Sequence, residues 1–265
     1  MDDTGKPPTA PYFSARNAAI AAFFDRRARD GDAPSESGVY YHESDQAYTR
    51  FLVPEGLDVL EVGSGAGDLL ASLKPRRGVG VDLSAKMVET ARKRHPNLEF
   101  HQMDAELPGA LASLGGTFDV IIASDTIGYL EDVGGFFAKL KPLLKPESRV
   151  IVAYYSRIWE PLLRLATALG LRKETPPLSW LSTADIEAMM TLGDLEFIRR
   201  EWRQLVPMHL FGLGSLINRF IAPLPLIRRL CLRNYIVGRP AVSAAARLRV
   251  SATGTASRPP TGSSA

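Results

Sequence analysis

Residues 59–68 read Val-Leu-Glu-Val-Gly-Ser-Gly-Ala-Gly-Asp, and this stretch decides the fold. Its first four residues form an apolar run typical of a buried strand, and three glycines at alternate positions follow. Glycine suits a tight turn that lies against a ligand, because a side chain there would collide with the ligand. A dinucleotide-binding turn has the spacing G-x-G-x-x-G, which Gly63 and Gly65 satisfy, but Asp68 occupies the third glycine position. The stretch predicts a strand, a ligand-binding turn and a helix.

Four acidic residues recur at nearly fixed spacing through the following part of the chain. Glu61, Asp82, Asp104 and Asp125 each end or follow an apolar run. Strands that alternate with helical segments at this period are βα units of a mostly parallel sheet, whose ligands bind outside the carboxyl ends of the strands. We therefore expect all four acids at one ligand-binding edge of the sheet. Capping of a helix is an alternative role for Asp82 and for Asp68.

The composition is that of an ordinary globular protein with a large core, since 45% of the 265 residues are hydrophobic and 23% are charged. The single cysteine, Cys231, excludes an internal disulfide and a cysteine-rich metal site. The four histidines lack metal-ligand spacing, so no metal is expected. The beginning of the chain does not resemble a signal peptide and no apolar run is long enough to span a membrane, so we expect a cytoplasmic protein.

Charge is unevenly distributed along the chain. Residues 202–265 contain nine arginines and no acid, whereas the preceding part contains 23 basic and 29 acidic residues. Such an asymmetry indicates a nucleic acid, a membrane surface or an acidic ligand as the partner. Residues 1–12 and a basic tail at 241–265 are expected to be disordered, because little in them could pack into a core.

Residues 13–240 are expected to form one α/β domain. A helix capped by Ser14 should extend to Asp30, and a polar loop at 31–38 should precede a second helix at 44–52. Alternation and apolar runs then predict seven strands. These are expected near residues 57–62, 78–82, 97–102, 118–123, 148–155, 195–206 and 232–237.

The sequence motifs resemble those of the class I S-adenosylmethionine-dependent methyltransferases, and in particular the broad small-molecule methyltransferase group. The resemblance covers roughly residues 40–240 and implies a Rossmann-like, seven-stranded, mostly parallel sheet. It further implies an antiparallel seventh strand, helices on both faces and an N-terminal helical lid. The matching motifs are Glu-Val-Gly-Ser-Gly-Ala-Gly at 61–67, Gly-Val-Asp-Leu-Ser at 80–84, Met-Asp-Ala-Glu-Leu-Pro at 103–108 and Phe-Asp-Val-Ile-Ile-Ala-Ser-Asp at 118–125.

The resemblance also implies which residues bind the cofactor S-adenosyl-L-methionine. Asp82 would accept hydrogen bonds from the ribose hydroxyls, Asp104 would accept from the adenine amino group, and Glu61 would lie close to the ammonium group. Further contacts are expected from the glycine turn, from apolar side chains beside the adenine and from residues near the methionine. These are Tyr41, Gly63, Ser64, Gly65, Gly67, Leu83, Met87, Ala105 and Ser124.

Transfer of a sulfonium methyl group mainly requires an acceptor that is held in line, which can be worth roughly 7–11 kcal/mol. A base is needed only when the acceptor is protonated. We expect His42 to be that base, and Asp125 or Tyr129 to orient the acceptor. An ordinary packed lid is the alternative role for residues 40–42.

The segment at 207–231 is expected to be an apolar insert on the active-site rim, between the last two strands. It is rich in Leu, Ile, Phe and Pro and contains Arg219, Arg228 and Arg229 but no acid. This composition suits an acceptor with a hydrophobic body and an anionic group, or contact with an anionic membrane surface. Packing of the apolar residues against the domain is the alternative.

The sequence therefore predicts methyl transfer from S-adenosylmethionine to oxygen, nitrogen or carbon of a small, hydrophobic acceptor. A non-catalytic cofactor-binding protein is an alternative, and a nicotinamide-dependent oxidoreductase is a weaker one because of Asp68. Residues 124–127, Ser-Asp-Thr-Ile, depart from the N/D-P-P-Y/F motif of amino-group base methyltransferases, which disfavours nucleic acid as the acceptor. The acceptor's identity and the oligomeric state stay open.

Overall fold

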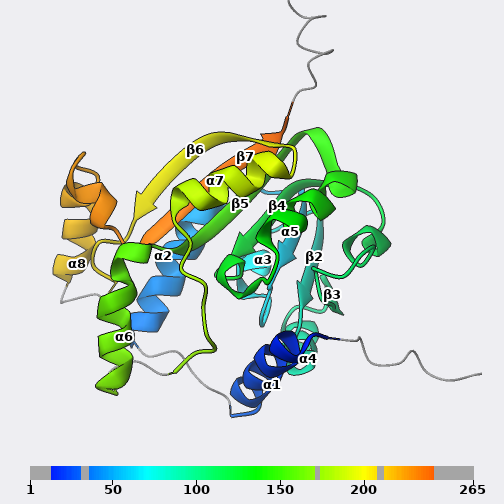
Figure 1. The fold of residues 1–265 in the computed structure, drawn as a ribbon, viewed down its shortest axis with the longest axis horizontal. Coiled ribbons are helices and arrows are strands. Elements are labelled where there is room, and N and C mark those ends of the chain that lie inside the picture. The colour runs from blue at the N-terminus through cyan, green and yellow to red at the C-terminus, as the bar shows by residue number, and fades with distance from the viewer. Residues whose placement is uncertain (1–12, 31–35, 171–173, 208–211, 242–265) are drawn as a thin grey trace, which may run out of the picture.

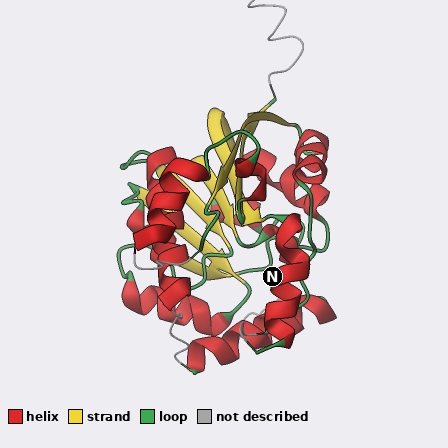
Figure 2. Ribbon diagram, turned by 90° about the vertical axis from the view of Figure 1, so that its left-hand side faces the viewer, coloured by secondary structure: helices red, strands yellow, loops and turns green. Residues whose placement is uncertain are grey.

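The computed structural model describes residues 13–30, 36–170, 174–207 and 212–241. Its centre is a seven-stranded sheet in the order β3-β2-β1-β4-β5-β7-β6, with helices on both faces (Figures 1 and 2). Strands β1 to β5 pair in parallel, while β7 pairs antiparallel with both β5 and β6. The expected fold is confirmed. The strands are β1 (Asp58–Val62), β2 (Arg77–Asp82), β3 (Glu99–Gln102), β4 (Phe118–Ser124), β5 (Leu144–Tyr155), β6 (Leu195–Arg203) and β7 (Arg233–Pro240).

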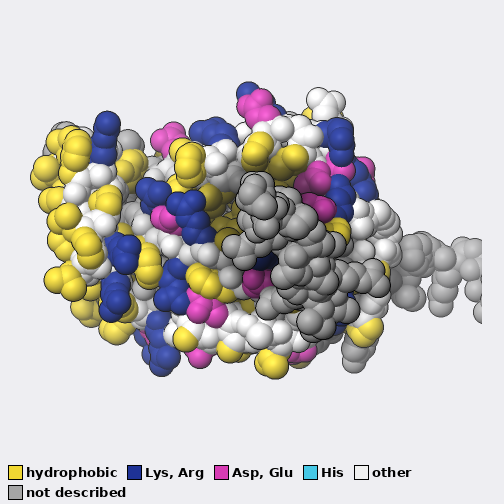
Figure 3. Space-filling model, turned by 90° about the horizontal axis from the view of Figure 1, so that it is seen from above, with side chains coloured by type: hydrophobic (Ala, Val, Ile, Leu, Met, Phe, Trp, Pro, Cys, Tyr) yellow, Lys and Arg dark blue, Asp and Glu magenta, His cyan; other side chains and the backbone are white. Residues whose placement is uncertain are grey.

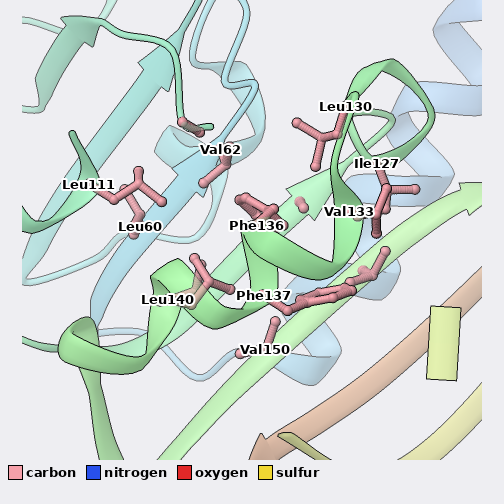
Figure 4. Packing of buried hydrophobic residues seen from close by; sticks show 14 of the residues in the cluster. Leu60, Val62, Leu111, Ile127, Leu130, Val133, Phe136, Phe137, Leu140 and Val150 are labelled. Atoms are coloured by element: carbon pink, nitrogen blue, oxygen red, sulfur yellow. The ribbon is translucent and has the colours of Figure 1, made fainter. Parts of the chain in front are cut away.

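Two hydrophobic cores lie on opposite faces of the sheet, because alternate strand residues point to opposite sides. Leu60 and Val62 pack with α5, α7 and the turn η1, whereas Val59 packs with α3 and α4. Figure 4 shows the first core, in which Phe136 and Phe137 of α5 lie over the central strands. The helices are α1 (Ala15–Arg29), α2 (Glu36–Leu52), α3 (Asp68–Ser72), α4 (Ala85–Arg94), α5 (Val133–Leu140), α6 (Glu160–Ala168), α7 (Thr183–Leu192) and α8 (Leu213–Leu216), and the single turns include η1 (Leu111–Leu114), η2 (Ile127–Tyr129), η3 (Lys141–Leu143), η4 (Arg157–Trp159), η6 (Ile217–Ile221) and η7 (Ile227–Leu230).

Side-chain caps fix the beginnings of four helices, one of which is α5, where Asp132 accepts a hydrogen bond from the Gly135 N–H. Ser14 accepts a hydrogen bond from the backbone of Asn17 at α1, and Ser84 accepts one from Met87 at α4. Ser182 and Asp185 form a reciprocal capping box at α7. Each cap satisfies a backbone N–H that has no partner within its own helix.

Two sequence expectations about element boundaries are wrong. Helix α2 begins at Glu36 rather than Ser44, so the expected loop at 31–38 is already helical from residue 36. Buried Tyr40 and Tyr41 pack along this first part of α2, and tertiary packing of this kind overrides weak local propensity. Strand β6 ends at Arg203, before the expected limit. Of the segments 1–12 and 241–265, expected to be disordered, all but Ala241 lie outside the described residues, and the Ala241 N–H donates to the Asp194 carbonyl at 2.9 Å.

The connection from β6 to β7 is the expected insert on the rim. The last paired residues are Arg203 and Arg233, opposite the end of β5, so the described residues between them lie beyond the carboxyl edge of the sheet. This connection contains α8, η6 and η7, which lie at the left end of Figure 1 together with α6. Within the described ranges, each helix is too short or too polar to cross a bilayer.

Candidate functional site

The four acids predicted to share an edge follow one another along it. Asp82 ends β2, Glu61 lies near the end of β1, and Asp104 and Asp125 follow β3 and β4. Because the sheet order is β3-β2-β1-β4, the spatial order of the acids is Asp104, Asp82, Glu61, Asp125. One edge therefore presents four carboxyl groups from four adjacent parallel strands.

The glycine turn between β1 and α3 leaves room for a ligand at one position. A Cβ at Gly63 would collide with the Thr126 hydroxyl, so glycine is required there for packing. Gly65 also has a positive φ of 52°, but a Cβ built on it would meet no atom within 4 Å. The expected cap at Asp68 is wrong, because left-handed Gly67 precedes α3 and the Asp68 carboxylate pairs with Arg94 and His95 instead.

Asp82 is held by backbone amides on both of its carboxylate oxygens. Its Oδ2 accepts from the Gly65 N–H at 2.8 Å, and its Oδ1 accepts from the Ser84 N–H at 2.8 Å. Burial raises the pKa of Asp82, while these backbone hydrogen bonds oppose the shift. The carboxylate is thus fixed between the glycine turn and the start of α4, which orients its remaining lone pairs.

Glu61 is a buried carboxyl group, 3% exposed, on the α3 side of β1. Its Oε2 accepts from the Leu70 N–H at 3.1 Å, and within the described ranges no cationic side chain forms an ion pair with it. Burial raises the pKa of Glu61 well above its usual value, and neighbouring carboxylates add to the shift. A buried carboxyl group without a protein cation suits a positively charged ligand group.

Helix α1 lies over the Asp104 end of the edge, in keeping with the expected N-terminal helical lid, although its contact with Asp104 was not predicted from the sequence. Asp104 is 4% exposed; its Oδ1 accepts from the Glu106 N–H and its Oδ2 accepts from the Asn17 side chain, both at 2.9 Å. The Oδ1 of Asn17 is buried and has no hydrogen-bond partner among the described residues. Asp25 of α1 also accepts from the Ser84 hydroxyl at 2.5 Å, which joins this helix to α4.

Asp125 lies in a buried network centred on Arg233 of β7. The Tyr41 hydroxyl donates to the Asp125 carboxylate at 3.1 Å, and the Arg233 guanidinium forms an ion pair with it. Burial raises the pKa of Asp125, although the charge of Arg233 lowers it. Asp125 also has a positive φ of 54°, a strained backbone conformation of the kind that clusters at functional sites.

The other members of this network come from α2, β4 and β7. Arg233, which is fully buried, donates to Asp45 at 2.8 Å and to the Ser124 hydroxyl at 2.7 Å. The Tyr235 hydroxyl donates to the same Asp45 carboxylate. Sequence reasoning missed Asp45, Arg233 and Tyr235, because their roles depend on contacts between segments far apart in the chain.

The remaining predicted residues lie around these groups. His42 is exposed on α2, with its ring 5.3 Å from that of Tyr41, and Tyr129 packs edge-on at 5.8 Å against Phe24 of α1. The side chains of Leu83 and Met87 are partly buried at the start of α4, whereas Ser64 and Ala105 are buried. No cluster of three or more His, Cys, Asp or Glu side chains that could hold a metal occurs in the described part of the chain.

Comparison with curated proteins gives partial matches. The chain is 27% identical over 185 residues to a polyamine aminopropyltransferase of Pyrobaculum neutrophilum, covering 60% of this chain and 63% of that protein. It is 31% identical over 113 residues to a ubiquinone biosynthesis O-methyltransferase of Rhodopseudomonas palustris, covering 40% of this chain and 43% of the relative. The chain thus spans less than two thirds of the length of either relative.

Comparison with solved structures supports the fold. The chain is similar to magnesium protoporphyrin IX methyltransferase of Synechocystis, solved with bound SAH, with a TM-score of 0.57 and 17% identity over 85% of this chain and 100% of that one. The sequence model of a methyltransferase domain family matches residues 16–217, which is most of this chain. The chain therefore belongs to the methyltransferase domain family and has the class I fold of the S-adenosylmethionine-dependent methyltransferases.

Proposed function

We propose that this protein transfers a methyl group from S-adenosylmethionine to a small, largely apolar acceptor. The observation that carries the proposal is the carboxyl edge itself, where Asp82 is locked against a glycine turn that has open space at Gly65. A nucleoside with vicinal hydroxyls fits this arrangement, since an immobilised carboxylate accepts two charge-assisted hydrogen bonds. The family match supports the same reaction over a nicotinamide-dependent one.

The proposed cofactor contacts follow the order of the acids. Asp82 accepts from the ribose hydroxyls, Asp104 accepts from the adenine amino group, and buried Glu61 faces the ammonium group, which supplies the cation that the protein lacks there. Open space at Gly65 lets the backbone approach the ligand. Further contacts are proposed for Tyr41, Gly63, Ser64, Gly67, Leu83, Met87, Ala105 and Ser124.

On the acceptor side, we propose that the protein's contribution is orientation. Bound S-adenosylmethionine supplies a methyl group that is already activated by its sulfonium. Asp125, fixed by Tyr41 and Arg233, accepts a hydrogen bond from the acceptor, and Tyr129 borders the same side. His42 remains the proposed base, because its ring is exposed beside Tyr41 and can pass a proton to water.

The proposed acceptor has a hydrophobic body and an anionic group. The support is the rim insert, in which Arg219, Arg228 and Arg229 are exposed beside exposed leucines. Quinone-related and porphyrin substrates named for the relatives are apolar molecules of this kind. Peripheral contact with an anionic membrane and the cytoplasmic location stay predictions.

Thermal unfolding with and without S-adenosylhomocysteine tests cofactor binding. At 100 times its dissociation constant, the ligand should stabilise the wild type by about 2.7 kcal/mol. Asp82→Ala should lose this gain, whereas Glu99→Ala, which removes an exposed carboxylate at the start of β3, should keep it. Absence of stabilisation in the wild type would overturn the cofactor assignment.

A cofactor-binding protein without transfer activity is the second candidate, because Arg233 and Tyr41 already engage Asp125. Release of S-adenosylhomocysteine in the presence of apolar hydroxyl or amine compounds separates the two functions. Binding without any such release across these acceptor classes would favour the non-catalytic protein.

A further inference from the structure

Two segments at one end of the molecule expose most of their large apolar side chains. Helix α6 and the turns η6 and η7 contain no buried residue, and α8 buries only Gly214. We call the large apolar residues of these segments the apolar end surface, and each is between 41% and 85% exposed. They are Ile158, Leu162, Leu165, Leu169, Leu213, Leu216, Phe220, Ile221, Leu224, Leu226 and Leu230.

The two segments form one end of the molecule. The indole N–H of Trp159, which precedes α6, donates to the carbonyl of Leu230 in η7 at 2.7 Å. Figure 1 places α6 and α8 at the same end, and Figure 3 shows hydrophobic side chains gathered there together with Lys and Arg. Exposed apolar surface of this extent marks a contact with a partner or a membrane.

The charges beside this surface have one sign. Arg219, Arg228 and Arg229 are exposed, and the sequence contains no acid after Glu201. Among the described residues, none of the three forms an ion pair with a carboxylate. The guanidinium of Arg219 lies 5.4 Å from the ring centre of Phe220, and that of Arg228 lies 4.9 Å from the ring centre of Trp202. These two arginines therefore lie beside aromatic rings.

We propose that the apolar end surface docks on an anionic lipid bilayer. Apolar side chains flanked by arginines match the acyl region and the charged headgroups of such a bilayer. A symmetric dimer through this face would bring two arginine-bearing patches without acids together, because an isologous interface joins identical patches. Charge complementarity thus favours an anionic membrane over a second copy of the chain.

Docking would bring the acceptor side of the site to the membrane. Ser215 of α8 lies 3.4 Å from the hydroxyl of Tyr40, and Asn218 of η6 donates to the same hydroxyl at 3.1 Å. Tyr40 is followed on α2 by Tyr41, which donates to Asp125. The inference that an apolar acceptor reaches this side from the bilayer rests on the proposed methyl transfer. The inference that the surface docks on the bilayer does not.

Flotation with lipid vesicles tests the docking. The full chain is mixed with vesicles of phosphatidylcholine alone or of equimolar phosphatidylcholine and phosphatidylglycerol. We expect binding to the anionic vesicles that weakens with salt, because headgroup attraction is screened. Replacing two arginines in Arg219→Gln/Arg229→Gln should lower the partition coefficient roughly thirtyfold, since each arginine contributes roughly a fivefold factor. Leu226→Ser should lower it about tenfold or more.

A matched variant controls for general effects of these substitutions. Leu192 is 80% exposed on α7 and Arg29 is exposed on α1, both outside the apolar end surface. Leu192→Ser/Arg29→Gln should float like the wild type. Equal losses in the control and in the surface variants, or no binding of the wild type to anionic vesicles, would overturn the proposal. So would concentration-dependent dimerisation that Leu226→Ser abolishes in the absence of lipid.

Quenching of tryptophan fluorescence tests how the protein is oriented on the bilayer. Of the three tryptophans, Trp159 and Trp202 contact Leu230 and Arg228 of the insert, whereas Trp180 precedes α7. In Trp180→Phe protein, brominated acyl chains should quench the fluorescence on addition of anionic vesicles. Lack of quenching in protein that floats would contradict docking through this surface.

Failure of the docking and failure of the proposed function are distinguishable. Asp82→Ala should lose stabilisation by S-adenosylhomocysteine and still float with anionic vesicles. Leu226→Ser should retain that stabilisation and float less. If S-adenosylhomocysteine does not stabilise the wild type, only the cofactor assignment is overturned. If the wild type does not float with anionic vesicles, only the docking is overturned.

Discussion

The carboxyl edge of the sheet has two parts whose side chains are held in different ways. At β1 to β3, Asp82 and Asp104 each accept one hydrogen bond from a backbone N–H two positions ahead, at Ser84 and Glu106, beside one contact with a more distant residue. At β4, β5 and β7, the groups are held by side chains from distant segments, as in the pairing of Arg233 with Asp45. The local contacts of the first part can therefore be encoded in short motifs, while the second part exists only in the folded domain.

Among the variants that test this difference between the two parts of the edge, Arg233→Met should have the largest effect on stability. Removing the guanidinium leaves the buried carboxylate of Asp45 and the partly buried one of Asp125 without their cation, which should cost about 3–5 kcal/mol of unfolding free energy. Arg239→Met breaks the partly exposed pair with Glu196 and should cost about 0–1 kcal/mol. Denaturant unfolding measures both values. Similar losses in the two variants would show that the network does not stabilise the β7 side.

On the other part of the edge, Gly65→Ala should impair the cofactor more than the fold. The added methyl group occupies the space proposed for the ligand, so affinity for S-adenosylhomocysteine should fall by about 1–3 kcal/mol. Gly56→Ala is the matched control, because Gly56 also has a positive φ with nothing within 4 Å of its Cβ position. Calorimetric titration of both variants decides the matter. An equal loss of affinity would exclude ligand contact at Gly65.

The pH dependence of cofactor affinity tests the proposed contact between Glu61 and the ammonium group. Burial raises the pKa of Glu61, so this group favours the folded state at low pH and loses that contribution as pH rises through the raised pKa. An ammonium group beside Glu61 would reverse the preference, because it favours the ionised carboxylate. Affinity should then increase with pH, by up to about tenfold per pH unit, until that pKa is passed. Glu61→Gln should remove this increase, and an unchanged profile in titrations would contradict the placement of the ammonium group.

The smallest effect is expected where α1 meets Asp104. Asn17→Ala removes one hydrogen bond to Asp104 and should cost about 1 kcal/mol of stability, with a similar loss in cofactor affinity because Asp104 is no longer held. Asn97→Ala, at an exposed position before β3, should change neither quantity. A loss of stability without any loss of affinity would separate α1 from the cofactor side of the edge.

The glycine turn and the spacing of the acids predicted the parallel strands and the edge that the acids share, because each βα unit repeats the same local pattern. The boundaries of α2 could not be predicted in this way. Polar residues around Tyr40 and Tyr41 read as a loop, and it is the burial of the two tyrosines in the fold that extends the helix to Glu36. A capping role was an alternative for Asp68 from its position alone, but its carboxylate pairs with Arg94 and His95 at the end of α4 instead.

The sequence by itself determined the sheet, the glycine turn and the edge on which Glu61, Asp82, Asp104 and Asp125 lie, since periodicity and short motifs depend on neighbouring residues. Only the tertiary structure decided that Arg233 is buried between Asp45 and Asp125, and that α1 lies over Asp104. It also decided that most large apolar side chains among the described residues of the insert stay exposed instead of packing against the domain. The reason is physical: burial and charge pairing between distant segments depend on how the whole chain packs, and no local pattern specifies that packing.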